Sequence, residues 1–146
     1  MVYKNILVAF DGSSASEHAL SSAQEFVECG LAEKIIILSV GDPTDVDDYT
    51  FEIAARMANV KITTETEDEV LKLVEKAKEL SKSFSNVTEV VSRIGKPQKA
   101  IIAAAKEYEC ELIVMGNRGL GAIRGALGSV SHAILRDAEV PVFIIK

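Results

Sequence analysis

The fold is decided by the segment Ile6-Leu7-Val8-Ala9-Phe10-Asp11-Gly12-Ser13, near the start of the chain. Five apolar residues in a row lead directly into Asp-Gly-Ser, which is a turn signal. An apolar run without alternation, bounded by turn residues, is typical of a strand buried on both faces. Ser13 then precedes an alanine-rich helical pattern and is a suitable N-cap. The segment therefore predicts a buried strand that turns into a helix packed close to a sheet.

The same alternation of apolar runs and helical patterns continues along the chain. Further strands are expected at residues 34–40, 87–92, 111–115 and 140–145. Helices are expected between Ser13 and Gly30, from Thr66 (with Glu69 in a capping box) to Leu80, from Pro97 to Ala105, and from Ser129 to Arg136. Residues 42–62 are less regular and predict a loop with a short helix. Alternating strands and helices predict an α/β fold with a parallel sheet and right-handed crossovers.

The composition is that of one folded domain covering residues 1–146. Hydrophobic residues make up 48% and charged residues 26% of the chain. The net charge of -6 argues against nucleic acid and anionic membranes as partners. No apolar run approaches the roughly 20 residues of a membrane span. No export signal is recognised, so the cytoplasm is the expected location, where Cys29 and Cys110 are expected to be isolated, reduced thiols.

A glycine-rich segment follows the fourth predicted strand. Five glycines lie between residues 116 and 128, and glycine allows backbone N–H groups to approach an anion closely. Gly128-Ser129 opens a helix whose N-terminus favours phosphate, with Ser129 as N-cap and hydroxyl donor. Arg118 could pair with phosphate, whereas Arg124 is interpreted as a solvated charge. The alternative is a flexible loop with a helix cap, and no Gly-Lys-Ser/Thr motif of the P-loop NTPases is present.

Asp11 stands where ligands bind in open α/β sheets, beyond the carboxyl end of a strand. Its carboxylate could accept hydrogen bonds from ribose hydroxyls, or it could close the turn and cap the next helix. Both interpretations stay open. The remaining polar candidates are interpreted as solvated: the histidines His18 and His132, and the acidic residues Asp42, Asp45, Asp47 and Asp48, which lack the order of an EF-hand.

Several of these stretches together resemble the universal stress protein A family. They are residues 4–13, Gly95-Lys96-Pro97, residues 111–121, Leu127-Gly128-Ser129-Val130-Ser131 and the closing run from Val140 to Ile145. The resemblance covers almost the whole chain. It implies an open, doubly wound, five-stranded parallel sheet with helices on both faces, Rossmann-like and of the adenine nucleotide alpha hydrolase type. It also implies a homodimer formed through residues 140–145.

The resemblance further implies a regulatory protein of the stress response that binds ATP, AMP or another adenine nucleotide. Mg²⁺ or Mn²⁺ would accompany a triphosphate, and strong catalysis is not expected, although slow ATP hydrolysis stays open. The implied contacts are Ala9 and Met115 around the base, the Val40 backbone at the adenine edge, Asp11 and Gly116 at the ribose, and Gly119, Gly128, Ser129 and Val130 at the phosphates.

The sequence departs from the family's ATP-binding pattern in one respect. That pattern places nine residues between two of its glycines, whereas eight residues separate Gly119 from Gly128. Deleting one residue rotates whatever helical segment follows by about 100°. The deletion could be absorbed near Gly125, or it could close the triphosphate pocket and leave a dimeric interaction module without ATP binding.

Overall fold

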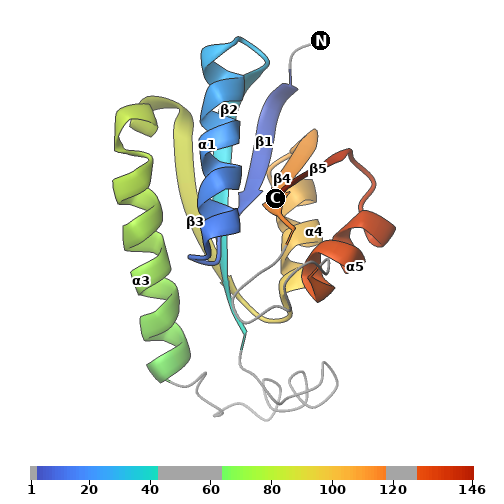
Figure 1. Cartoon of the computed structure of the whole chain (residues 1–146). Helices are drawn as coiled ribbons and strands as arrows, with labels where there is room; N and C mark the ends of the chain where they lie inside the picture. The colour runs from blue at the N-terminus through green and yellow to red at the C-terminus, as the bar shows by residue number, and fades with distance from the viewer. Residues whose placement is uncertain (1–2, 43–63, 118–127) are drawn as a thin grey trace.

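The computed structural model describes residues 3–42, 64–117 and 128–146 (Figure 1). Each apolar run of the sequence forms a strand, and each amphipathic pattern in these ranges forms a helix. In chain order the elements are β1 (Tyr3–Ala9), α1 (Ser14–Glu28), β2 (Ala32–Gly41), α3 (Thr64–Leu80), the 3-10 helix η1 (Lys82–Val87), β3 (Thr88–Ile94), α4 (Pro97–Glu107), β4 (Leu112–Gly116), α5 (Ser129–Asp137) and β5 (Val142–Ile145).

The five strands form one parallel sheet in the order β3-β2-β1-β4-β5. The expected α/β fold with a doubly wound parallel sheet is therefore confirmed. The chain first moves outward from β1 to β2 and β3, and then crosses to the other side of β1 to form β4 and β5. The strand order thus reverses between β1 and β4, and in such sheets the ligand crevice lies at the carboxyl ends of the two strands flanking the reversal.

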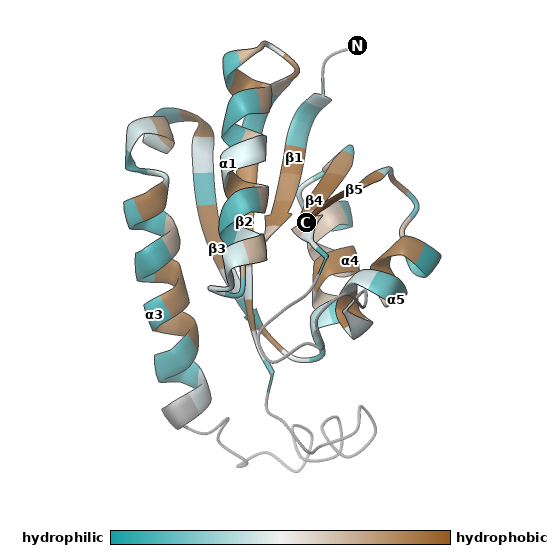
Figure 2. Cartoon of the chain, viewed as in Figure 1, coloured by the Kyte–Doolittle hydropathy of each residue, from teal (hydrophilic) through white to brown (hydrophobic). Residues whose placement is uncertain are grey.

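Helices cover both faces of the sheet. One buried cluster joins Ile6 and Val8 of β1 to α1 and α3, and a second joins Leu7 to α4 and α5. Successive residues of β1 therefore point into opposite cores, as expected for a strand buried on both faces. Figure 2 shows the result, with largely hydrophobic strands and helices that are hydrophobic on only part of their surface.

Most of the predicted element ends agree with the structure. Ser13 is the N-cap of α1, Gly30 adopts a positive φ of 77° just beyond that helix, and Pro97 begins α4. The capping box was wrong, because α3 begins at Thr64 and Thr66 is a buried residue inside its first turn. The helix η1 was not predicted. The short helix expected within residues 42–62 lies outside the described residues.

None of the helices in the described ranges combines the length and the apolar character that crossing a membrane would require.

Candidate functional site

The candidate site lies at the carboxyl edge of the sheet, where β1 and β4 run side by side. Gly116, the last residue of β4, lies between the first turns of two helices. A Cβ on Gly116 would lie 2.6 Å from the Cβ of Ala15 in α1. On the other side, the Ser131 hydroxyl of α5 donates a 2.7 Å hydrogen bond to the Gly116 carbonyl oxygen. Glycine at this position allows α1 to approach closely, and the Ser131 bond holds the N-terminus of α5 at the same strand end.

The turn between β1 and α1 is held by side chains on both of its sides. The Asp11 Oδ1 atom accepts a 2.9 Å hydrogen bond from the backbone N–H of Ser13, and the Ser13 hydroxyl accepts one of 3.1 Å from the N–H of Ser16. The turn-closing role of Asp11 is therefore present. An ionised carboxylate has about four acceptor positions, and Asp11 is partly exposed, so it retains capacity to accept from a ligand.

Helix α3 contacts the same turn through Lys76. The Lys76 Nζ atom lies 3.4 Å from the Gly12 carbonyl oxygen and 2.7 Å from the Glu17 carboxylate of α1. Gly12 has a φ of +83°, and a Cβ there would be 3.0 Å from the Leu73 side chain. Sequence reasoning did not identify Lys76, because it lies in a helix rich in lysine and glutamate where nothing distinguishes it.

The three residues expected around the base share one side of the sheet. Ala9, Val40 and Met115 all pack against the cluster that faces α4 and α5. Met115 is buried, whereas Ala9 and Val40 are partly exposed. The ladder between the strands continues past the end of β1, because the Phe10 N–H donates a 2.9 Å hydrogen bond to the Leu38 carbonyl oxygen. The structure thus brings together residues that are far apart in the sequence.

The two ends of the glycine-rich segment are tied together. The Gly128 N–H donates a 2.6 Å bond to the Asn117 carbonyl oxygen, and the Asn117 N–H donates a 2.7 Å bond to the Ile145 carbonyl oxygen. These bonds fix the start of α5 beside the ends of β4 and β5. The expected phosphate contacts Gly128, Ser129 and Val130 are therefore at the site, while Arg118, Gly119 and Arg124 lie outside the described residues.

Ser129 does not cap α5 as expected. The N-cap is Gly128, which makes no side-chain capping bond, and Ser129 is the first, exposed residue of the helix. Ser131, which sequence reasoning missed, makes the buried hydrogen bond to Gly116. Its only signal in the sequence was a small polar residue two positions after Ser129, in the first turn of the predicted helix.

The end of β2 contributes a further carboxylate. Asp42 was grouped with a solvated acidic loop. The residue is partly exposed, but its Oδ1 atom is buried and has no hydrogen-bond partner, so only part of the side chain is solvated. The other residues of that group, Asp45, Asp47 and Asp48, lie outside the described residues. The interpretation of the two histidines is confirmed, since His18 and His132 are exposed.

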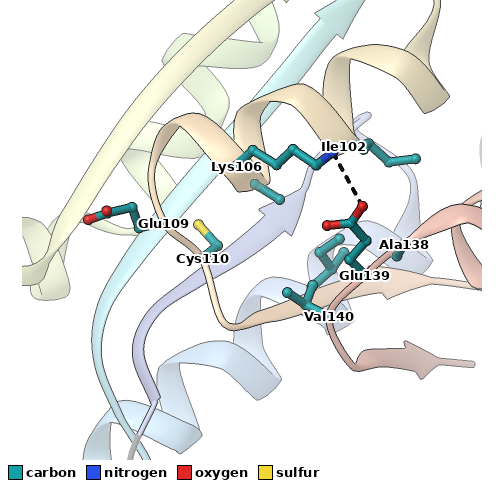
Figure 3. Close-up of a pocket in the computed structure, with 9 residues that line it drawn as sticks. Ile102, Lys106, Glu109, Cys110, Ala138, Glu139 and Val140 are labelled. Carbon is teal, nitrogen blue, oxygen red and sulfur yellow. Dashed lines mark ion pairs between the residues drawn. The ribbon is translucent and has the colours of Figure 1, made fainter.

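A separate cavity of about 220 Å³ opens at the opposite, amino edge of the sheet (Figure 3). Its walls include Ile102, Ile113 and Val140, and the ion pair between Lys106 and Glu139 (3.5 Å) lies beside it. Cys110 lines it, and burial raises the pKa of its thiol to about 11. The thiol is therefore protonated near neutral pH and a poor nucleophile. Cys29 is exposed and both cysteines are free, as expected.

Comparison of the sequence with known proteins identifies a family. The model of the universal stress protein family matches residues 2–146. The universal stress protein YxiE of Bacillus subtilis is 32% identical, with 99% of this chain and 100% of that protein covered.

Solved structures agree with this match. The universal stress protein UspA from Lactobacillus plantarum has a TM-score of 0.78 at 22% identity, covering 100% of this chain and 99% of that one. A universal stress protein solved in complex with cAMP has a TM-score of 0.69 at 25% identity and covers 100% and 99% of the two chains. Because the family model spans residues 2–146 and a relative of 32% identity is matched over its full length, the chain belongs to the universal stress protein family.

Proposed function

We propose that the protein is a cytoplasmic regulatory protein of the stress response that binds an adenine nucleotide at the carboxyl edge of the sheet, without fast turnover. The observation that carries the proposal is the position of Gly116 between the first turns of α1 and α5, with the Asp11 turn at the end of the neighbouring strand. The cAMP complex of a relative with the same fold supports the class of ligand.

Each part of a nucleotide has a matching group at this edge. Ala9 and Met115 would contact the base on the side that faces α4 and α5, with the Val40 backbone at its edge. Asp11 and the close backbone at Gly116 suit a ribose, whose hydroxyls donate to a carboxylate. The backbone N–H groups of the first turn of α5 suit phosphate, because a helix N-terminus carries roughly half a positive charge. Arg118 and Gly119 are proposed as further phosphate contacts from the sequence.

Calorimetric titration with AMP, cyclic AMP and Mg-ATP tests the proposal. We expect saturable binding of at least one of them. Asp11→Asn should weaken binding by about tenfold to a hundredfold, because it removes the charge from a hydrogen bond to the ligand. Asparagine keeps an oxygen for the Ser13 N–H, so the turn should persist. Asp137→Asn, at the exposed end of α5, is the matched control and should bind normally. The absence of heat with every nucleotide would end the proposal.

The expectation of a binding protein rather than an enzyme is also tested with ATP. The sequence lacks a lysine placed as in P-loop NTPases to act on a transferring phosphoryl group. We therefore expect no fast release of phosphate when ATP is incubated with the protein and Mg²⁺. Phosphate release that depends on both Asp11 and Ser129 would contradict this part of the proposal.

A dimeric interaction module without ATP binding is the second candidate. It is favoured by the eight-residue spacer between Gly119 and Gly128, one residue shorter than the ATP-binding pattern of the family. Inserting one residue beside Gly125 should then create ATP affinity that the original chain lacks. Tight ATP binding by the unaltered protein would eliminate this candidate.

We also propose that the protein forms a homodimer through its last strand. In the described part of the sheet, β5 pairs only with β4, so its outer edge is open. All four of its residues are apolar, and Phe143 is 44% exposed. The other edge strand, β3, carries Glu89 and Arg93, which pair with Lys34 and Glu107. Charges protect an edge strand from association, so β5 is the edge suited to a second copy.

A further inference from the structure

The end of β2 holds a buried acceptor that the protein itself does not satisfy. The Asp42 Oδ1 atom is buried from solvent and lacks a hydrogen-bond partner. A buried carboxylate oxygen without a donor is unfavourable, so such an atom calls for an explanation. In the described ranges the other buried, unpartnered side-chain oxygen is that of Thr88. Thr88 begins β3, at the amino edge, so Asp42 is the one that lies at the edge of the candidate site.

The alternation of β2, extended by one residue, predicts that Asp42 lies on the side of the expected base. Leu38 and Val40 pack toward α4 and α5. Gly41 faces the other side, because a Cβ there would lie within 3 Å of Val70 and Thr66 in α3. Successive residues point to opposite faces of a sheet, so we expect Asp42, the residue directly after β2, to continue the side of Val40. The strand end is also held, since the Gly41 carbonyl oxygen accepts a 2.9 Å bond from the Gly95 N–H.

We propose that Asp42 Oδ1 accepts a hydrogen bond from one of the two N–H groups of the exocyclic amino group of adenine, beside the Val40 backbone at the same edge, and makes the site selective for adenine over guanine. This inference rests on the proposed function and adds a specificity-determining residue to it. Adenine carries an N6 amino group with two N–H donors, whereas guanine presents a carbonyl oxygen at the same ring position. A carboxylate oxygen can accept a hydrogen bond from the amino group of adenine. Opposite the carbonyl oxygen of guanine, the same carboxylate leaves two acceptors facing each other.

The proposal predicts a change in nucleotide preference when only one oxygen of the side chain is replaced. Asp42→Asn keeps the shape but supplies an N–H that can donate to the guanine oxygen. In titrations with AMP and GMP, the ratio of the two dissociation constants should shift toward GMP by about ten- to a hundredfold relative to the unaltered protein. Asp137→Asn, an equal change of charge at an exposed site, should leave the ratio unchanged.

A second measurement needs no variant and therefore does not depend on how Asp42→Asn folds. Purine riboside 5′-monophosphate is AMP without the amino group. The unaltered protein should bind it less tightly than AMP, and IMP, with a carbonyl oxygen, less tightly still. In the cycle that combines this ligand change with Asp42→Ala, which removes the acceptor altogether, the two losses should be non-additive, because both remove the same hydrogen bond.

The outcomes separate the two proposals. Suppose that the unaltered protein binds AMP. If the ratio of its dissociation constants for AMP and GMP is the same in Asp42→Asn, or if it binds AMP and IMP equally well, the role of Asp42 is overturned and nucleotide binding stands. If the unaltered protein binds no adenine nucleotide, the proposed function is overturned and the role of Asp42 with it.

Discussion

Two glycines determine how closely helices approach the carboxyl edge of the sheet. At Gly41 an added Cβ would be 2.4 Å from a methyl carbon of Val70 and 2.9 Å from that of Thr66. At Gly116 it would be 2.9 Å from the backbone carbonyl carbon of Ala15. The Gly41 overlap involves side chains and can be relieved by substitution, whereas the Gly116 overlap involves the backbone of α1. Shortening a side chain of α3 should therefore reduce the cost of an alanine at Gly41, whereas no substitution in α1 should do so at Gly116.

Gly41→Ala should lower the free energy of unfolding by about 1–3 kcal/mol, the usual cost of overpacking a core. Val70→Ala alone should also destabilise, because it leaves a cavity. In the double variant the new methyl group occupies space vacated by the valine, so the two losses should not add. Urea denaturation of the four proteins measures this coupling, and strict additivity would contradict the packing of α3 on the end of β2.

The buried thiol of Cys110 links stability to alkaline pH. Its pKa is raised from 9.0 to about 11 by burial, so the folded state holds the proton more tightly than the unfolded chain. The stabilising contribution is complete below about pH 9 and is lost as the pH rises toward about 11. Cys110→Ala should reduce this alkaline loss, measured as the free energy of unfolding against pH. The exposed control Cys29→Ala should retain it, and equal slopes in both variants would contradict the argument.

At the scale of elements, α1 is fixed at its beginning by the same turn that forms the site. Ser13 caps the helix and Asp11 closes the turn that precedes it. Ser13→Ala should cost about 1 kcal/mol in thermal or urea unfolding, the usual cost of losing an N-cap. Ser14→Ala is the matched control, because Ser14 is exposed and is the first residue within the helix. Equal stability of the two variants would show that the cap does not hold the turn.

The sequence was most informative where one pattern governs a whole element. The strand from Ile6, the cap at Ser13 and the helix from Pro97 were all predicted, because their signals are local in the sequence. Thr66 was misassigned, since its methyl group packs against Gly41 and no local pattern reveals that contact.

At the site, Asp11 and Gly116 could be located from the sequence, because strand ends and glycines are visible there. Lys76 and Ser131 could not, since each acquires its role from a segment distant in the chain. The burial of the Asp42 Oδ1 atom has no local signal in the sequence either.

At the scale of the whole molecule, the open edge of β5 predicts association. Light scattering at micromolar concentration should give a dimer, and Phe143→Lys should shift it toward monomer by placing a charge on the edge strand. Because the Phe143 ring also packs against Phe26 of α1 at 5.4 Å between centroids, thermal unfolding of the variant is measured alongside to show that it is folded. Leu71→Lys is the matched control, because Leu71 is 58% exposed but lies on α3, away from β5. A monomeric unaltered protein, or a dimer insensitive to Phe143→Lys, would contradict the proposed interface.

The central claim is that the carboxyl edge between β1 and β4 binds an adenine nucleotide. The most direct measurement is a titration with AMP followed by the amide NMR signals of the labelled protein. The account predicts shifts confined to the Asp11–Ser13 turn, the end of β2, and Gly116 with the first turn of α5. Signals around the cavity at Cys110 and Glu139 should stay in place. Shifts centred on that cavity, or no shifts at all, would contradict the account.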